Sequence, residues 1–265
     1  DLTLLTGRPG WRMKAPDLPP VYLQKPRPVE AYASRQAKGV TMEMAPMAAL
    51  ADAAVPTVER LTTQFTLQLP VPTSMEGFEQ GKRVDLERRE LPSTFWSAIT
   101  PALQETAYLH GEATVDLTWP ILPGSATLLV DGAVVGKTQL GLINPGDELE
   151  IGFGENPALV VEYKVLDVMA RDTGVFDKVR RYKRHYQTEV RNLMPVAHTV
   201  RVNSRYPISR DEEIEVERIE PAGIEVDPET GRFHWERLLA PDETAVFSTQ
   251  FEITAPRDWE LPQHF

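Results

Sequence analysis

The chain contains no cysteine among its 265 residues. This absence excludes disulfides, thiolate metal sites and a cysteine nucleophile. The sequence also lacks any run of about 18 apolar residues, the length that a membrane-spanning helix needs. We therefore expect no membrane span in this chain, and we predict that any chemistry it performs uses oxygen or nitrogen groups.

The chain has fewer basic residues than acidic residues. Lysine and arginine number 28 against 39 aspartates and glutamates, which gives a formal net charge of −11. Nucleic acids and anionic membranes repel such a chain at long range. The composition therefore argues against a general nucleic-acid binder, although a local basic patch is compatible with it.

Helical patterns are scarce, whereas proline is frequent at 23 residues. Many prolines stand at the ends of apolar runs, as at strand ends and turns, because proline cannot donate to a β-ladder. From residue 60 onward apolar and polar residues alternate, and turn signals recur about every 8–12 residues, which is typical of a β-sandwich. Asp131-Gly132, between the β-type runs 126–130 and 133–138, is a strong two-residue hairpin signal. The apolar run 159–169 predicts a central strand.

These patterns predict an all-β protein of two antiparallel β-sandwich-like units. Residues 57–157 form the first unit and residues 158–265 the second, which we expect to be immunoglobulin-like. Residues 1–56 hold an N-terminal strand, a proline-rich stretch and an Ala/Met-rich linker; within it, residues 33–56 could instead form a short helix that docks on a partner. The chain begins at Asp1 without an initiator methionine, so we expect a fragment of a longer protein.

Residues 132–138 read Gly-Ala-Val-Val-Gly-Lys-Thr and look like a phosphate-binding loop. Such a loop has four residues between its first glycine and Gly-Lys-Thr, and a helix follows it. Here only three residues intervene, and a strand-like sequence follows. We predict a plain strand and no nucleotide site.

A basic cluster interleaved with tyrosines is the candidate binding site. Its members are Lys178, Arg180, Arg181, Lys183, Arg184, Tyr182 and Tyr186. In an acidic chain this cluster could bind an anionic glycan, a phosphate or an acidic partner. Strand alternation divides it, with Lys178, Arg180 and Arg184 on one face and Arg181, Lys183 and His185 on the other. The simpler interpretation is a solvated or edge strand, where basic residues prevent unwanted pairing.

The histidines are scattered, at His110, His185, His198, His234 and His264. His110 with Glu112, and His234 with Glu236, share a strand face, so they could supply a metal site only if the fold brought them together. No His-x-x-x-His spacing and no Gly-x-Ser-x-Gly elbow is present. We therefore predict no catalytic residue, no metal and no cofactor, and we interpret the histidines as surface or cross-strand hydrogen-bonding groups.

Several different short motifs follow one another in a specific order along the chain. They are Leu4-Leu-Thr-Gly-Arg-Pro9, Ile121-Leu-Pro-Gly124, Glu189-Val-Arg-Asn192, Tyr206-Pro-Ile-Ser209 and Leu239-Ala-Pro-Asp-Glu243. By these motifs the chain resembles the C-terminal domain, of unknown function, of the mucoidy inhibitor A family. The resemblance implies a mostly β fold, a bacterial origin, export to the envelope, and an upstream domain and coiled coil. It supplies no catalytic residues.

The main functional hypothesis is a non-enzymatic interaction module of a bacterial envelope-associated protein, linked to exopolysaccharide production. We expect a periplasmic or envelope location, and a protein partner or self-association. One alternative is an acidic-glycan-binding module that uses the basic cluster. The other is an enzyme with a site between the two β units.

Overall fold

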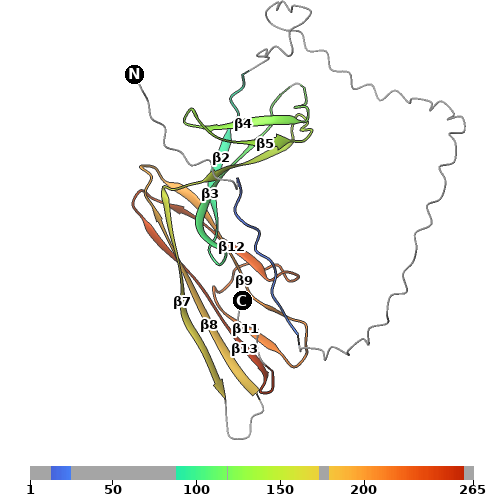
Figure 1. Cartoon of the computed structure of the whole chain (residues 1–265), viewed down its shortest axis with the longest axis vertical. Coiled ribbons are helices and arrows are strands. Elements are labelled where there is room, and N and C mark those ends of the chain that lie inside the picture. The colour runs from blue at the N-terminus through green and yellow to red at the C-terminus, as the bar shows by residue number, and fades with distance from the viewer. Residues whose placement is uncertain (1–12, 25–87, 118, 173–178, 260–265) are drawn as a thin grey trace, which may run out of the picture. The chain divides into compact units, whose positions relative to one another are not determined.

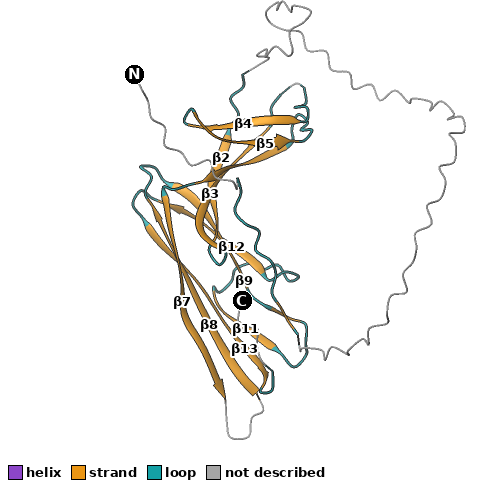
Figure 2. Ribbon diagram, in the orientation of Figure 1, coloured by secondary structure: helices purple, strands orange, loops and turns teal. Residues whose placement is uncertain are grey.

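The computed structural model describes residues 13–24, 88–117, 119–172 and 179–259 (Figure 1). Within this part of the chain every regular element is a strand, and Figure 2 shows no helix. The predicted all-β, sandwich-like fold is therefore confirmed. The described residues 13–24 and those from 90 onward belong to one compact unit. The strand expected at 2–6 and the linker or helix expected at 33–56 lie outside the described residues.

The strands are β1 (Tyr22–Leu23), β2 (Ser93–Thr100), β3 (Gln104–Thr114), β4 (Gly124–Val130), β5 (Ala133–Leu140), β6 (Glu148–Glu155), β7 (Leu159–Asp172), β8 (Val179–Asn192), β9 (His198–Arg205), β10 (Ile208–Ser209), β11 (Glu215–Glu220), β12 (Arg232–Leu239) and β13 (Thr244–Pro256). No helix with the length and hydropathy to cross a membrane occurs in the described ranges.

A five-stranded sheet has the order β12-β9-β2-β3-β6. Its pairs are antiparallel except β2 with β9, which run parallel with Trp96 opposite Thr199. This pairing joins strands from both sides of the boundary expected after residue 157. The described residues from 90 onward likewise belong to a single compact unit.

A four-stranded antiparallel sheet has the order β11-β13-β8-β7. The polar strand β8 therefore lies inside this sheet, between β13 and β7. The prediction that residues 159–169 form a central strand is wrong, because β7 has a strand partner on one side alone among the described residues. Exposed side chains of Val160, Val165 and Leu166 account for part of its apolar character.

The core lies between these two sheets. One buried cluster joins Ile99, Val200 and Val202 of the five-stranded sheet to Val190 and Phe247 of the four-stranded sheet. Since strand residues alternate between faces, the side chains at these positions define the inner face of each sheet. A second cluster is largely aromatic; it includes Tyr182, Tyr206, Phe233, Phe251 and Trp259.

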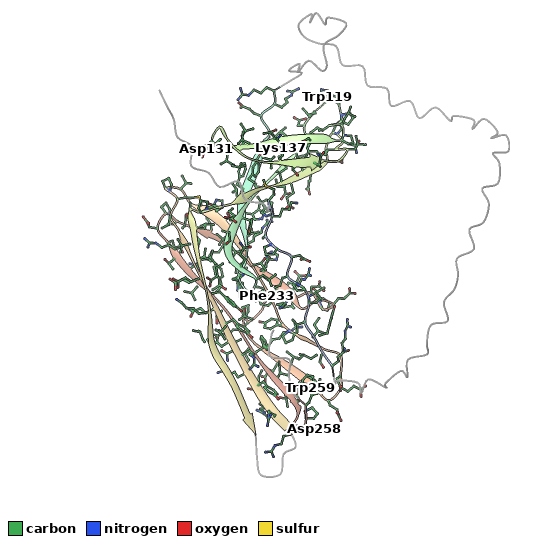
Figure 3. All side chains as sticks on the ribbon, in the orientation of Figure 1. Trp119, Asp131, Lys137, Phe233, Asp258 and Trp259 are labelled. Carbon is green, nitrogen blue, oxygen red and sulfur yellow. The ribbon has the colours of Figure 1, made fainter. Side chains whose placement is uncertain are left out.

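Strands β4 and β5 form a separate two-stranded sheet. Val130 pairs with Ala133, so the loop contains only Asp131 and Gly132, both with positive φ. The predicted two-residue hairpin is confirmed; Figure 3 labels Asp131 at its turn and Lys137 on its second strand. Lys137 lies within β5, as expected for a plain strand rather than a phosphate-binding loop.

Residues 13–24 cross the outer face of the five-stranded sheet. Gly154 N donates to Met13 O at 3.2 Å, and β1 pairs in parallel with β10. A Cβ on Gly152 would lie 2.2 Å from Met13 O, so glycine permits this close crossing. Leu18 and Leu23 are buried, which fixes the segment on the sheet.

Candidate functional site

A row of contacts crosses the outer face of the five-stranded sheet from edge to edge. His110 on β3 contacts Glu150 on β6 at 3.0 Å and stacks on Trp96 of β2 with ring centroids 5.7 Å apart. The guanidinium of Arg201 on β9 lies 4.1 Å from the Trp96 ring centroid, and its Nε donates to Glu236 on β12 at 2.6 Å. One side chain from each of the five strands is therefore held in a defined position.

Beside this row lies a pocket of about 490 Å³ between residues 14–18 and the sheet. Ala98 lies on the central strand β2, and its small side chain leaves room above the sheet. The polar and charged lining residues are Lys14, Asp17, His110, Asn203, Ser204, Asp227, Arg232 and His234. The volume is within the range of about 300–1,000 Å³ that is usual for small-molecule sites.

His110 is the most deeply buried titratable group of the pocket, with its side chain 8% exposed. Burial lowers the pKa of His110 below its usual value, although the hydrogen bond with Glu150 acts in the opposite direction. Because a carboxylate only accepts, Nδ1 carries the proton that His110 donates to Glu150. In this neutral form Nε2 keeps its lone pair, and the described residues offer that atom no hydrogen-bond partner.

The cations of the pocket already have anionic partners. Arg232 Nη1 lies 3.1 Å from Asp17 Oδ1, and Nη2 of Arg232 donates to Asp17 Oδ2 at 3.2 Å. Lys14 Nζ lies 3.8 Å from Glu150 Oε1. Arg232 Nε, by contrast, is buried without a hydrogen-bond partner among the described residues. Both unpaired atoms, Nε2 of His110 and Nε of Arg232, are therefore buried beneath the surface of the pocket.

The basic cluster predicted from the sequence is divided between the two faces of β8, as alternation implies. Tyr182 and Arg184 are buried on the inner face, and Tyr186, also on this face, stacks on Tyr163 with centroids 5.9 Å apart. The positions of the remaining members follow: Arg180 is half-buried, Arg181 faces outward 3.4 Å from Glu252, Lys183 is half-buried on the outer face, and Lys178 lies outside the described residues. Glycan binding by this cluster stays a prediction.

The histidines take separate roles. His110 and His234 line the same pocket, together with the carboxylates of Asp17 and Asp227. His185 Nε2 lies 2.8 Å from Ser248 Oγ, and His198 Nε2 lies 2.9 Å from Ser97 Oγ. His264 is outside the described residues. Within the described ranges no group of three His, Cys, Asp or Glu side chains is arranged to hold a metal ion.

Sequence reasoning missed Arg232, Asp17 and Asn203 as members of the pocket. A signal for Arg232 was present, because Arg232, His234 and Glu236 alternate on one face of β12. No comparable signal exists for Asp17 or Asn203. These residues reach the pocket through the crossing of the N-terminal segment and the pairing of β9 with β2, which are long-range features.

Acid is expected to destabilise the domain through its buried histidines. Burial lowers the pKa of His198 from its usual 6.5, and burial also lowers the pKa of His110. Below about pH 6.5 the unfolded state therefore binds more protons than the folded state, and stability falls as the pH drops toward the folded-state pKa values. Urea midpoints measured between about pH 8 and about pH 5 should decrease over this range.

His198→Gln should flatten this pH profile, because the substituted side chain cannot gain the proton in the unfolded state. His234→Gln is the matched control, since the His234 side chain is exposed. A stability that does not change between pH 8 and pH 5 would contradict the prediction.

The fold and the pocket define a β-sandwich domain with a polar pocket on the outer face of one sheet. Residues 1–257 match the model of a family described as Domain of unknown function (DUF4139), and the chain belongs to this family. The chain is also 23% identical over 198 residues to Protein F37C4.5 of Caenorhabditis elegans. The match covers 70% of this chain and 36% of that protein, so the chain spans about a third of the length of this relative. No solved structure matches.

Proposed function

We propose that the domain is a non-enzymatic interaction module that associates through the β4–β5 hairpin. The observation that carries this proposal is the exposed apolar surface of the hairpin. Leu129 and Val134 are paired across the two strands and are 52% and 64% exposed. Leu122 and Leu142, just outside the strands, are each 56% exposed. Exposed apolar side chains paired across two strands, as Leu129 and Val134 are, supply the kind of surface on which a partner can pack.

Strand β4 also offers a free backbone edge. Its sequence, Gly-Ser-Ala-Thr-Leu-Leu-Val, has neither a charged residue nor a proline, the features with which proteins usually block edge pairing. Among the described residues its strand partner is β5 alone. A second strand can therefore add to β4 through main-chain hydrogen bonds.

The partner that we propose is a second copy of the domain. Antiparallel addition of β4 to β4 about a twofold axis places the same residues on both sides, so one apolar edge serves both copies. Self-association of this kind agrees with the upstream coiled coil that the resemblance to the mucoidy inhibitor A family implies.

We further propose a bacterial envelope or periplasmic location for the longer protein and a link to exopolysaccharide production. The resemblance to the mucoidy inhibitor A family supports both. Cell fractionation of the full-length protein tests the location, and its recovery in the cytosolic fraction alone would contradict it.

Leu129→Lys is expected to weaken self-association by tenfold or more, because it places a charge in the proposed interface, a loss of about 1.4 kcal/mol. Sedimentation equilibrium in about 0.15 M salt, which screens the repulsion between acidic chains, gives the dimer dissociation constant. Val246→Lys is the matched control, since Val246 is 50% exposed on β13, a strand of the four-stranded sheet outside the hairpin. A wild-type chain that stays monomeric, or an equal effect of both substitutions, would overturn the proposal.

A further inference from the structure

A second cavity, of about 600 Å³, borders both β12 and β13. Residues 234–237 of β12 and residues 246–248 of β13 line it, together with Ile224 from the segment between β11 and β12. Successive residues of a strand point to opposite faces of a sheet. A cavity lined by three or four successive residues of a strand therefore runs along the backbone edge of that strand, and we call this cavity the edge groove.

Strand β13 has an unpaired length beside the edge groove. Strand β11 pairs with β13 from Thr254 to Gln250, and Glu220 is its last residue in the ladder. Pro221 follows, and proline has no N–H group with which to continue the pairing. Among the described residues, the stretch 244–249 of β13 therefore has a strand partner on the β8 side alone.

The hydrogen-bond pattern shows which backbone groups of β13 face the groove. Asn192 N donates to Glu243 O at 3.0 Å, and this pair continues the register of β8 with β13. In an antiparallel ladder, hydrogen-bonded pairs alternate with pairs that are not hydrogen-bonded. Every second residue after Glu243 therefore bonds to β8, whereas Val246 and Ser248 direct their N–H and C=O groups to the open side.

The facing edge of β12 has the same arrangement. Tyr206 N donates to Gly231 O at 2.8 Å in the register of β9 with β12, so by the same alternation His234 and Glu236 direct their backbone groups away from β9. The groove thus lies between two rows of backbone donors and acceptors that no described strand uses. An extended peptide that adds as a strand is the class of ligand that pairs with such a row.

The two faces of the open β13 edge differ in chemistry. Toward the core, Trp235 and Phe247 line the groove with ring centroids 5.5 Å apart. On the outer face, Ser248 Oγ donates to Glu220 Oε2 at 2.8 Å, which holds this carboxylate beside the edge. A strand next to β13 therefore meets aromatic rings on its inner face and a carboxylate on its outer face.

The charges of the groove favour a basic partner. Glu236 and Arg237 are already paired, with Arg201 at 2.6 Å and with Glu243 at 2.8 Å. Glu220, by contrast, has no ion-pair partner within the part of the chain that the structure describes, and the net charge of the whole chain is −11. Both the local carboxylate and the overall charge attract lysine or arginine side chains.

We propose that the edge groove binds an extended peptide segment of a partner protein, which adds to β13 as a strand in line with β11. The segment alternates apolar side chains, which pack on Trp235 and Phe247, with basic side chains directed to the face that carries Glu220. The stem of a basic side chain can lie along Val246, which is 50% exposed. The edge of β13 takes the strand because it continues the four-stranded sheet and lies beside the Glu220 carboxylate.

The test is a fluorescence-anisotropy titration of the whole chain against two labelled heptapeptides, Lys-Val-Lys-Val-Lys-Val-Lys and Glu-Val-Glu-Val-Glu-Val-Glu. The basic peptide is expected to bind with a dissociation constant of about 100 µM or tighter, and the acidic peptide at least about tenfold more weakly. No saturable binding of the basic peptide up to about 1 mM, or equal affinity for both peptides, would overturn the proposal.

Two substitutions at Ser248 test the backbone pairing. Ser248→Pro and Ser248→Ala both remove the hydroxyl that donates to Glu220, but only proline removes the N–H group that faces the groove. Proline is tolerated where the N–H group points away from the neighbouring strand, so the ladder of β13 with β8 is expected to persist. Ser248→Pro should weaken binding of the basic peptide about tenfold or more, and Ser248→Ala less than about threefold. Equal affinities of the two variants would overturn the assignment to the β13 edge.

Glu220→Gln tests the charge and decides the question if circular dichroism shows Ser248→Pro to be unfolded. Glu220 is exposed, so this variant should fold, and it is expected to bind the basic peptide about two- to fivefold more weakly. Salt of about 0.5 M should abolish this difference. Glu225→Gln is the matched control, because Glu225 is exposed and does not line the groove. An equal effect of both substitutions would overturn the proposal.

The edge groove and the β4–β5 hairpin are tested independently, because Leu129→Lys alters the hairpin and Ser248→Pro alters the groove. Sedimentation equilibrium of Ser248→Pro identifies a different occupant. Loss of self-association in this variant, together with no binding of the basic peptide by the wild-type chain, would assign the groove to a second copy of the domain and overturn the proposal.

Discussion

Asn192→Ala is expected to lower the free energy of unfolding by about 3–5 kcal/mol, a large fraction of the stability of a typical domain. Asn192 is fully buried at the end of β8. Its Nδ2 donates to the carbonyl oxygens of Val196, Leu239 and Ala240 at 3.0–3.2 Å, and its Oδ1 accepts from Met194 N at 2.9 Å. Alanine would remove this partner from four backbone groups, and the Leu239 carbonyl would lose it at a buried contact.

Urea unfolding followed by circular dichroism measures this loss. Asn144→Ala is the matched control. The Asn144 side chain is exposed and donates to Asp147 within a turn, so its removal should cost less than about 1 kcal/mol. Equal effects of the two substitutions would show that burial does not set the contribution of Asn192.

Gly231→Ala is expected to destabilise the domain by about 2–4 kcal/mol, because the new Cβ meets both a steric and a conformational obstacle. Gly231 has φ of +70°, and its Cβ would lie 2.1 Å from Tyr206 O. The same backbone approach places Tyr206 N in a hydrogen bond with Gly231 O at 2.8 Å. Tyr206 stacks on Phe233 in the aromatic cluster, so a shift at Gly231 is transmitted to the core.

Gly132→Ala separates the two obstacles. Gly132 has φ of +81°, but no atom lies within 4 Å of its Cβ position. Only the conformational cost remains there, about 1 kcal/mol. Melting temperatures of both variants give the comparison, and a loss at Gly231 no larger than that at Gly132 would contradict the steric argument.

Local patterns predicted much of the fold. Alternation and turn signals identified the strands, and Asp131-Gly132 identified the hairpin, because both depend on residues close in sequence. The division of the basic cluster between two faces followed from the period of a strand. Predicting these features does not require knowing which strands pair.

Sequence patterns could not predict which strands that are distant in the chain pair with one another. The apolar run of β7 suggested a central strand, but neighbours in a sheet are chosen by tertiary packing, and β8 took the inner position. The pocket depends on the parallel pairing of β2 with β9 and on the crossing of residues 14–18. The importance of Asn192 appears only once the ends of β8 and β12 are close together. Its place in a motif of the family resemblance gave no indication of this role.

The order of strands in the four-stranded sheet has a consequence for synthesis on the ribosome. Strand β13 is the last of the described strands to be made, yet it lies between β11 and β8. Until it emerges, β8 has an open edge, and the core between the sheets lacks the side chains of Phe247, Phe251 and Ile253. The nascent domain therefore exposes an unpaired edge beside an incomplete core until late in translation, the interval in which aggregation competes most strongly with folding and chaperones are most needed.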